Sequence, residues 1–332
     1  MKTPEGPRPP ARGPVAPLDL SGLATYSLAE RPSKVSVEAF ARPVTPGGSL
    51  GAFLASLPDI LLGRDFRVLA GRLADVCRRG KPLVIGLGAH VIKVGLSPLL
   101  IDLMERGLVA GLAMNGAGIV HDSELAMVGR TSEEVDEVIG SGAFGAARET
   151  GLIVNEGARR AAAAGIGLGA GLGALLLERD FPFNHLSLVA TAARLGVPLT
   201  VHVALGTDIV HIHPSADGAA IGQASLHDFR VFAGLVAGLD GGAYLNIGSA
   251  VLLPEVFLKA LTAARNLGHP VAAITCVNMD FIRQYRPLTN VVHRPTREGG
   301  QGFHLTGHHE IMVPLLVAAL LEALAARPAA TG

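Results

Sequence analysis

The feature that most constrains the fold of this chain is an alternation between short apolar segments and longer segments with helical periodicity. The apolar segments are rich in Val, Ile, Leu and Ala, and most lack polar residues at alternate positions. This composition is typical of strands that are covered on both faces. The sequence predicts strands at residues 82–88, 108–114, 198–205, 208–213, 242–248 and 270–277.

Helical patterns occupy the intervening segments and the C-terminal region. They are predicted at residues 97–107, 132–139, 225–238, 254–268 and 310–326. Pro254 suits a first helical turn, and Gly268 suits a helix end. Strand–helix–strand order requires crossover connections. The sequence therefore predicts an α/β fold, Rossmann-like and doubly wound, with a mostly parallel sheet and helices on both faces.

Composition indicates the domain organisation, the classes of partner and the cellular compartment. A single α/β domain is expected at residues 51–328, after a flexible Pro-rich arm at 1–20 and a surface segment at 21–50. Balanced charge, with 28 Lys plus Arg and 28 Asp plus Glu, argues against nucleic acid or an anionic membrane as the main partner. Two cysteines in unrelated segments favour a reducing compartment. No signal peptide is apparent, so we expect a cytoplasmic protein.

Glycine and polar residues follow the predicted strands, where ligands of doubly wound sheets bind. Glycine turns lead into helices at residues 86–95 and 115–122, and Gly248 begins a third turn. Glycine lets backbone N–H groups approach a phosphate, and a helix N-terminus favours its charge. Several such turns favour a dinucleotide site, although tight strand-to-helix turns alone also need glycine. Asn115 is expected to help hold the dinucleotide, while His121 and Asp122 either cap the next helix or reach the reacting group.

Two other motifs admit a structural and a functional interpretation. Gly169, Gly171 and Ala174 match GxGxxA, but they follow a helical pattern, so a helix-to-helix turn or close packing is predicted. His211 and His213 fall on one face of a predicted strand, with His202 and Asp208 nearby. This group is compatible with a zinc or iron site, although neither HExxH nor CxxC occurs.

Five segments resemble the deoxyhypusine synthase family, whose members have a Rossmann-like NAD-binding fold. They are GLGAHVIKVGLSPLLIDLMERGLVAGLAMNGAGIVHD, GTDIVHIHP, GAYLNIGSAV, PVAAITCVNMDF and IMVPLLVAALLEAL. The resemblance implies NAD as cofactor and a homo-oligomer such as a tetramer. It also implies that Asp208 matches a carboxylate that binds an amine substrate. Cofactor contacts are implied for Gly88, Ala89, His90, Asn115, Gly116, Ala117, Gly118, Gly248, Ser249, Asn278 and Asp280.

The chain departs from that family at the nucleophile. The family transfers an aminobutyl group through an active-site lysine, and the matching region TNVVHRPTREGG offers His293, Arg294 and Arg297 instead. Arginine stays protonated and is no ready nucleophile. Lys93 could reach the crevice from the first loop. The chain also has no tryptophan, whereas the family has a tryptophan-containing acidic loop.

Three hypotheses remain open at this stage. The first is a deoxyhypusine synthase-like NAD-dependent enzyme, a transferase or an oxidoreductase, acting on a small amine or amino acid without the usual lysine. In it His211, His213 or His293 acts as base, Asp208 binds a cationic group and Arg294 an anionic group. The second is a metal-dependent hydrolase or lyase that uses His202, His211, His213 and Asp208. The third is a nucleotide-binding protein without catalysis.

Overall fold

The computed structural model describes residues 13–326. It divides into two units, one ending at Ala39 and the other beginning at Phe40. The described part of the first unit contains two short 3-10 helices, Leu28–Glu30 (η1) and Val37–Ala39 (η2), and none of its residues is buried. The predicted arm at residues 1–20 lies mostly outside the described residues.

The second unit is built on a six-stranded parallel sheet with the order β3-β2-β1-β4-β5-β6. The strands are Leu83–Leu87 (β1), Gly111–Asn115 (β2), Leu199–His202 (β3), Ala243–Ile247 (β4), Thr275–Asp280 (β5) and Gln301–Thr306 (β6). All five strand pairings are parallel. The predicted Rossmann-like, doubly wound fold is therefore confirmed.

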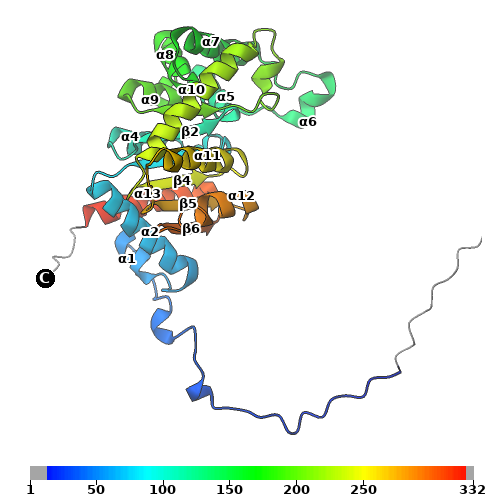
Figure 1. The fold of residues 1–332 in the computed structure, drawn as a ribbon, viewed down its shortest axis with the longest axis vertical. Coiled ribbons are helices and arrows are strands. Elements are labelled where there is room, and N and C mark those ends of the chain that lie inside the picture. Colours follow the sequence, from blue (N-terminus) through cyan, green and yellow to red (C-terminus); the bar gives the residue numbers. More distant parts are fainter. Residues whose placement is uncertain (1–12, 327–332) are drawn as a thin grey trace, which may run out of the picture. The chain divides into compact units, whose positions relative to one another are not determined.

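Helices cover both faces of this sheet (Figure 1). The longer ones are Leu61–Arg78 (α2), Ser97–Glu105 (α4), Gly116–Val128 (α5), Arg148–Ala164 (α7), Leu168–Arg179 (α8), Leu188–Leu195 (α9), Gly218–Ala237 (α10), Leu252–Asn266 (α11) and His309–Ala325 (α13). Shorter helical segments are Leu50–Ser56 (α1), His90–Lys93 (α3), Val135–Val138 (α6), Ile139–Ser141 (η3), Asn184–Leu186 (η4), Ile209–Ile212 (η5), Tyr285–Pro287 (α12) and the π-helical turn Leu288–His293 (η6).

The core explains why the strands are apolar on both faces. Leu83 and Ile85 of β1 pack in one core cluster, whereas Val84 between them packs in the other. Their side chains alternate across the sheet, and helices cover both sides. Fully burying one such side chain stabilises a fold by about 1.5–3 kcal/mol. Because both faces are buried, these strands lack the apolar–polar alternation that is typical of a half-exposed sheet.

Two predicted elements are corrected by the structure. Residues 208–213 were predicted as a strand but form the 3-10 helix η5, because Asp208 and His211 cap each other's backbone in a capping box. The helix predicted at 132–139 shrinks to α6 and a short 3-10 turn. The edge strand β6 was not predicted, because its sequence QGFHLT is polar and only partly buried.

The GxGxxA segment lies in the first turns of α8, just after the turn between α7 and α8, and of the two predicted alternatives close packing is confirmed. Gly165 ends α7 with a positive φ of 67°, and α8 begins three residues later. A Cβ atom on Gly169 would lie 1.9 Å from the carbonyl oxygen of Leu199, and one on Gly171 would lie 2.6 Å from Ala161 Cβ. These glycines allow α8 to pack closely on β3 and α7. Within residues 13–326, no single helix is long and apolar enough to span a membrane; α7 and α8 meet that test only as a pair bent by 116°.

Candidate functional site

The turns after β1, β4 and β6 are hydrogen-bonded to neighbouring strand ends along the carboxyl edge of the sheet. Gly88 N donates to Ile247 O at 2.8 Å, Gly248 N to Met279 O at 2.9 Å, and Gly307 N to Asp280 O at 3.0 Å. A Cβ atom on Gly88 would lie 2.0 Å from Gly248 O, so only glycine permits this approach. The chain leaves β1 toward β2 on one side and later returns to β4 on the other. The Gly88–Gly248 contact therefore marks the topological switch point, where such folds bind ligands.

A cluster of aromatic rings lies at the same edge. The ring of His90, which begins α3, is 5.6 Å from the ring of His309 and 6.2 Å from that of Phe281. His309 Nε2 is 3.4 Å from Met279 O, and its Nδ1 is buried with no hydrogen-bond partner among the described residues. Burial lowers the pKa of His309, although Met279 O and Asp280 oppose this. His309 thus presents a neutral imidazole at the switch point.

Two predicted cofactor residues lie beneath this edge rather than on it. Asn278 is fully buried, and its side chain bonds to Asn246 Nδ2 at 2.7 Å and to His304 Nδ1 at 3.1 Å. Ser249 Oγ accepts from Leu253 N at 3.2 Å, at the start of α11. Both side chains hold the strand ends in place and are already hydrogen-bonded within the protein.

The turn after β2 is closed by the protein's own carboxylate. Asn115 caps α5 by accepting from Gly118 N at 3.0 Å. A Cβ atom on Gly116 would lie 1.9 Å from Asp208 Oδ2, and Ala117 N donates to Asp208. Burial raises the pKa of Asp208, which His211 and the Ala117 N–H oppose. Asp208 therefore lies where a phosphate at the N-terminus of α5 would lie.

A cavity of about 240 Å³ opens beside α5 and contains charges of both signs. It is lined by Lys93, Ala117, Val120, His121, Glu124, Ser132, Glu133, Val135, Phe144, Thr207, Asp208 and Ile209. Glu133 also accepts from Gly145 N at 3.1 Å. Three carboxylates suit a cationic amine, and Lys93 suits an anionic group.

His121 enters this cavity from inside α5, not from a turn. Its Nδ1 is 2.6 Å from Thr131 Oγ1, and Thr131 Oγ1 donates to Glu124 Oε2 at 2.5 Å. Thr150 Oγ1 donates to the other oxygen of Glu124 at 3.0 Å. Burial lowers the pKa of His121; nearby Lys93 adds to this and Glu124 opposes it. His121 was left without a definite role by the sequence, and Glu124 and Glu133 were given no site role.

Asp122 is buried and does not reach the cavity. It accepts hydrogen bonds from Leu188 N at 2.7 Å, Val189 N at 3.2 Å and the Ser187 hydroxyl, at the start of α9. Burial raises its pKa to about 6, against the effect of these donors. Asp122 therefore caps α9, which is distant in sequence. The predicted alternative, that it caps the next helix, is wrong.

The remaining predicted catalytic residues do not line the cavity. His211 Nε2 is 3.9 Å from Asp208, whereas His213 Nε2 bonds to Gly145 O at 2.8 Å. His293 and Arg294 are exposed on the segment between β5 and β6, where Arg294 donates to Asn290 at 2.8 Å. Of the predicted catalytic group, the structure therefore joins Lys93 and Asp208 in one cavity, with His211 adjacent.

The proposed metal group does not assemble. His202 is buried on β3 beside Thr200 and Phe232, and burial lowers its pKa to about 3. Across residues 13–326, no group of three or more His, Cys, Asp or Glu could hold a metal ion. The metal-dependent hydrolase or lyase hypothesis therefore has no site in this part of the chain.

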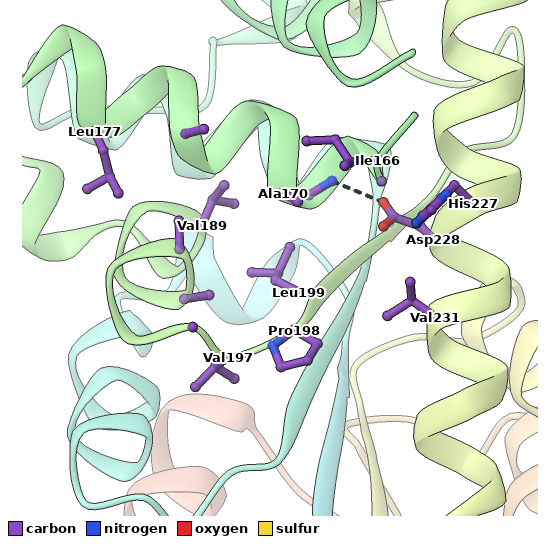
Figure 2. Close-up of a pocket in the computed structure, with 16 residues that line it drawn as sticks. Ile166, Ala170, Leu177, Val189, Val197, Pro198, Leu199, His227, Asp228 and Val231 are labelled. Atoms are coloured by element: carbon purple, nitrogen blue, oxygen red, sulfur yellow. Dashed lines mark hydrogen bonds between the residues drawn. The ribbon is translucent and has the colours of Figure 1, made fainter. Parts of the chain in front are cut away.

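A second, larger cavity of about 460 Å³ lies at the amino end of β3, opposite the carboxyl edge of the sheet. Figure 2 shows Asp228 and Val231 of α10 opposite Ala170 of α8 and Leu199, the first residue of β3. Asp228 accepts from Gly169 N at 3.0 Å and from Val201 N at 2.9 Å. Because the groove opens at the amino end of β3, it lies away from the strand ends where ligands of this fold bind.

Comparison with known proteins gives similarity at the level of structure. No family model and no curated protein sequence matches the chain. A conserved protein from Methanococcus maripaludis S2, provisionally assigned to the LOR/SDH class, superposes with a TM-score of 0.50 at 13% identity, over 78% of this chain and 69% of that one. Unliganded AgrE gives a TM-score of 0.50 at 17% identity, over 80% of this chain and 33% of AgrE.

A protein from Entamoeba histolytica, provisionally assigned as a deoxyhypusine synthase, is also similar. Its TM-score is 0.48 at 11% identity, over 85% of this chain and 96% of that one. At these identities the similarities to the LOR/SDH protein and AgrE establish the fold, and the chain has the Rossmann-like α/β fold that these proteins share.

Proposed function

We propose that this protein is an NAD-dependent enzyme that oxidises a small amine or amino acid bound in the cavity beside α5. The observation that carries the proposal is the position of α3. This short helix begins next to the Gly88–Gly248 contact and ends at Lys93 in the cavity. A cofactor at the switch point and a substrate in the cavity would therefore meet along one helix.

The residues at the switch point fit a dinucleotide in part. The backbone of Gly88 packs directly on the Gly248 carbonyl, so neither side chain covers this point of the edge, and His309 Nδ1 is buried without a hydrogen-bond partner among the described residues. These residues, with Ala89 and His90, would hold the cofactor, which supplies a hydride acceptor. Asp208 makes the N-terminus of α5 the less favourable place for its phosphates.

The charges of the cavity suggest how an amino acid would be oriented. Lys93 would bind the carboxylate, and Glu133 and Asp208 would bind amino groups, because each then pairs with the opposite charge. This arrangement would hold the substrate with its oxidisable carbon facing α3. No lysine replaces the family nucleophile in residues 289–300, so aminobutyl transfer through an imine is not part of the proposal.

The direct test is NAD reduction by a panel of amines and amino acids, with Lys93→Met as the variant and Lys81→Met as its control. Ornithine and arginine belong in the panel, because AgrE has been solved with ornithine and NAD+ and an AgrE mutant with L-arginine. We expect Lys93→Met to raise KM about tenfold or more, since a hydrogen bond between charged groups contributes about 1.5–3 kcal/mol. NAD affinity should not change.

Lys81 is also exposed but lies just before β1, at the opposite edge of the sheet. Its substitution should therefore leave both KM and NAD affinity unchanged. Absence of NAD binding by calorimetry would refute the proposal. Binding of NAD without turnover of any amine or amino acid would instead favour the non-catalytic hypothesis.

A further inference from the structure

We propose that His121 is the general base of this reaction, and that Thr131 and Glu124 fix its tautomer so that Nε2 is the basic nitrogen facing the cavity. This inference rests on the proposed function and identifies a catalytic group that the sequence left unassigned. Thr131 and Glu124 act as positioning residues: Thr131 contacts His121 Nδ1, and both carboxylate oxygens of Glu124 accept hydrogen bonds from threonine hydroxyls.

The direction of the hydrogen bonds determines the tautomer. Thr131 has one hydroxyl proton, and it is donated to Glu124 Oε2 at 2.5 Å. The Thr131 oxygen can then only accept from His121 Nδ1, which lies 2.6 Å away. A carboxylate is a stronger acceptor than a neutral imidazole, so this direction is the favoured one. Nδ1 therefore carries the proton in the neutral ring, and Nε2 carries the lone pair.

Nε2 is left available for a ligand. It has no hydrogen-bond partner among the described residues, and the ring lines the cavity together with Lys93. The charged groups around the ring are Glu124 on α5 itself, Lys93 at the end of α3, Asp208 just before η5, and Glu133 in the loop between α5 and α6. Burial and Lys93 lower the pKa of His121, and the ring is therefore neutral and basic near neutral pH.

The proposed step balances as an amine oxidation. The amine that reacts would be neutral, having released the proton of its ammonium form to solvent. His121 Nε2 would take a proton from this neutral amine as its N–H bond breaks and a C=N bond forms. A bound nicotinamide would supply the two-electron acceptor for the hydride that leaves the substrate carbon. The imidazolium that forms can be stabilised through Thr131 by the Glu124 carboxylate.

The first test observes the tautomer directly by ¹⁵N NMR of histidine side chains in the full chain, without cofactor or substrate. At a pH above the His121 pKa we expect the Nδ1–H form in the native protein. Thr131→Val should convert His121 to the Nε2–H form, whereas Thr131→Ser should keep Nδ1–H. Thr150→Val is the matched control, because it removes a hydrogen bond to Glu124 without touching His121.

The second test measures kinetics. General bases contribute about 100- to 10,000-fold, so His121→Gln should lower kcat at least about 100-fold with NAD affinity unchanged. The fall in native kcat as pH decreases through the His121 pKa should also disappear in this variant. Thr131→Val should lower kcat and Thr131→Ser should restore it.

The outcomes separate this inference from the proposed function. An Nε2–H tautomer in the native protein, or no change of tautomer in Thr131→Val, overturns the relay even if the enzyme binds NAD and oxidises an amine. An unchanged kcat in His121→Gln overturns the role as base. A native Nδ1–H tautomer in a protein that binds no NAD would leave the hydrogen-bond geometry correct and refute the function.

Discussion

At the scale of single residues, buried carboxylates carry much of the organisation of this protein. Asp122 caps α9, Asp208 closes the start of α5, and Asp228 caps α8 while bonding to the edge strand β3. Each accepts backbone N–H groups that would otherwise be unpaired at a helix start. Each also bears the cost of burial, which raises its pKa. These residues couple parts of the chain that lie far apart in sequence.

Asp228 leads to a prediction about pH. Burial raises its pKa to about 7, despite N–H donors from Gly169, Val201 and Leu168. In the unfolded chain its pKa is near 3.8, so the folded state keeps the proton between these values. The contribution of Asp228 to stability is therefore complete below the unfolded pKa and is lost as pH rises to about 7.

The measurement compares native protein with Asp228→Asn by urea unfolding at about pH 4.5 and about pH 7.5. We expect the free energy of unfolding of the native protein, relative to the variant, to fall by a few kcal/mol, as an order of magnitude, over this interval. Other groups, including Asp122, cancel in this difference. A difference that does not depend on pH would show that Asp228 is ionised throughout.

The position of His121 explains why the sequence could not identify it as the proposed general base. His121 lies in the stretch LAMNGAGIVHDSE, which reads as a glycine turn, but α5 begins at Gly116 and carries His121 on its second turn. Its hydrogen-bond partner Thr131 lies in the loop after α5, which ends at Gly129. No local pattern signals this contact. Lys93 was identified from its place in the loop after the first predicted strand, and Asp208 from its place beside the HxH segment and from the family resemblance.

At the scale of elements, the apolar pattern predicted strands that are buried on both faces. It failed for an edge strand and for a segment whose conformation is set by a local capping box. The strands β1, β2 and β4 were predicted close to their observed limits, because each is a mostly apolar run between helices. β6 is an edge strand with polar residues and escaped prediction. In DIVHIH the apolar residues alternate as in a strand, yet a side-chain capping box turns the segment into η5.

Close packing of α7 and α8 gives a prediction at this scale. A Cβ atom on Gly171 would lie 2.6 Å from Ala161 Cβ and 3.0 Å from Gly157 O. Gly171→Ala should therefore destabilise the protein by about 1–3 kcal/mol, because overpacking forces the helices apart. Thermal or urea unfolding measures this change.

The matched control is Gly222→Ala in α10. No atom lies within 4 Å of a Cβ built there, and the residue is exposed in the helix. Alanine should therefore stabilise this helix by about 0.5–1 kcal/mol. Equal effects of the two substitutions would mean that α7 and α8 do not pack as described.

At the scale of the whole molecule, the parallel sheet determines where chemistry can occur. Strand order brings Gly88 and Gly248 into contact although they lie far apart in sequence, and α3 then leads from that contact to the charged cavity. Strand–helix alternation was sufficient to predict the parallel sheet, along whose carboxyl edge the candidate site is proposed. It did not place His309 at this edge, because His309 follows β6, an edge strand whose polar sequence was not predicted, and it did not show that Asn278 is buried within β5.

The most direct test of the central claim is hydrogen–deuterium exchange of the full chain with and without NAD. We expect NAD to slow exchange at residues 86–93, 247–252 and 278–282, which contain the turns joined along the carboxyl edge. Exchange in α8 and at the amino end of β3 should stay the same. Protection confined to α8 and β3, or no protection at a saturating NAD concentration, would contradict the account.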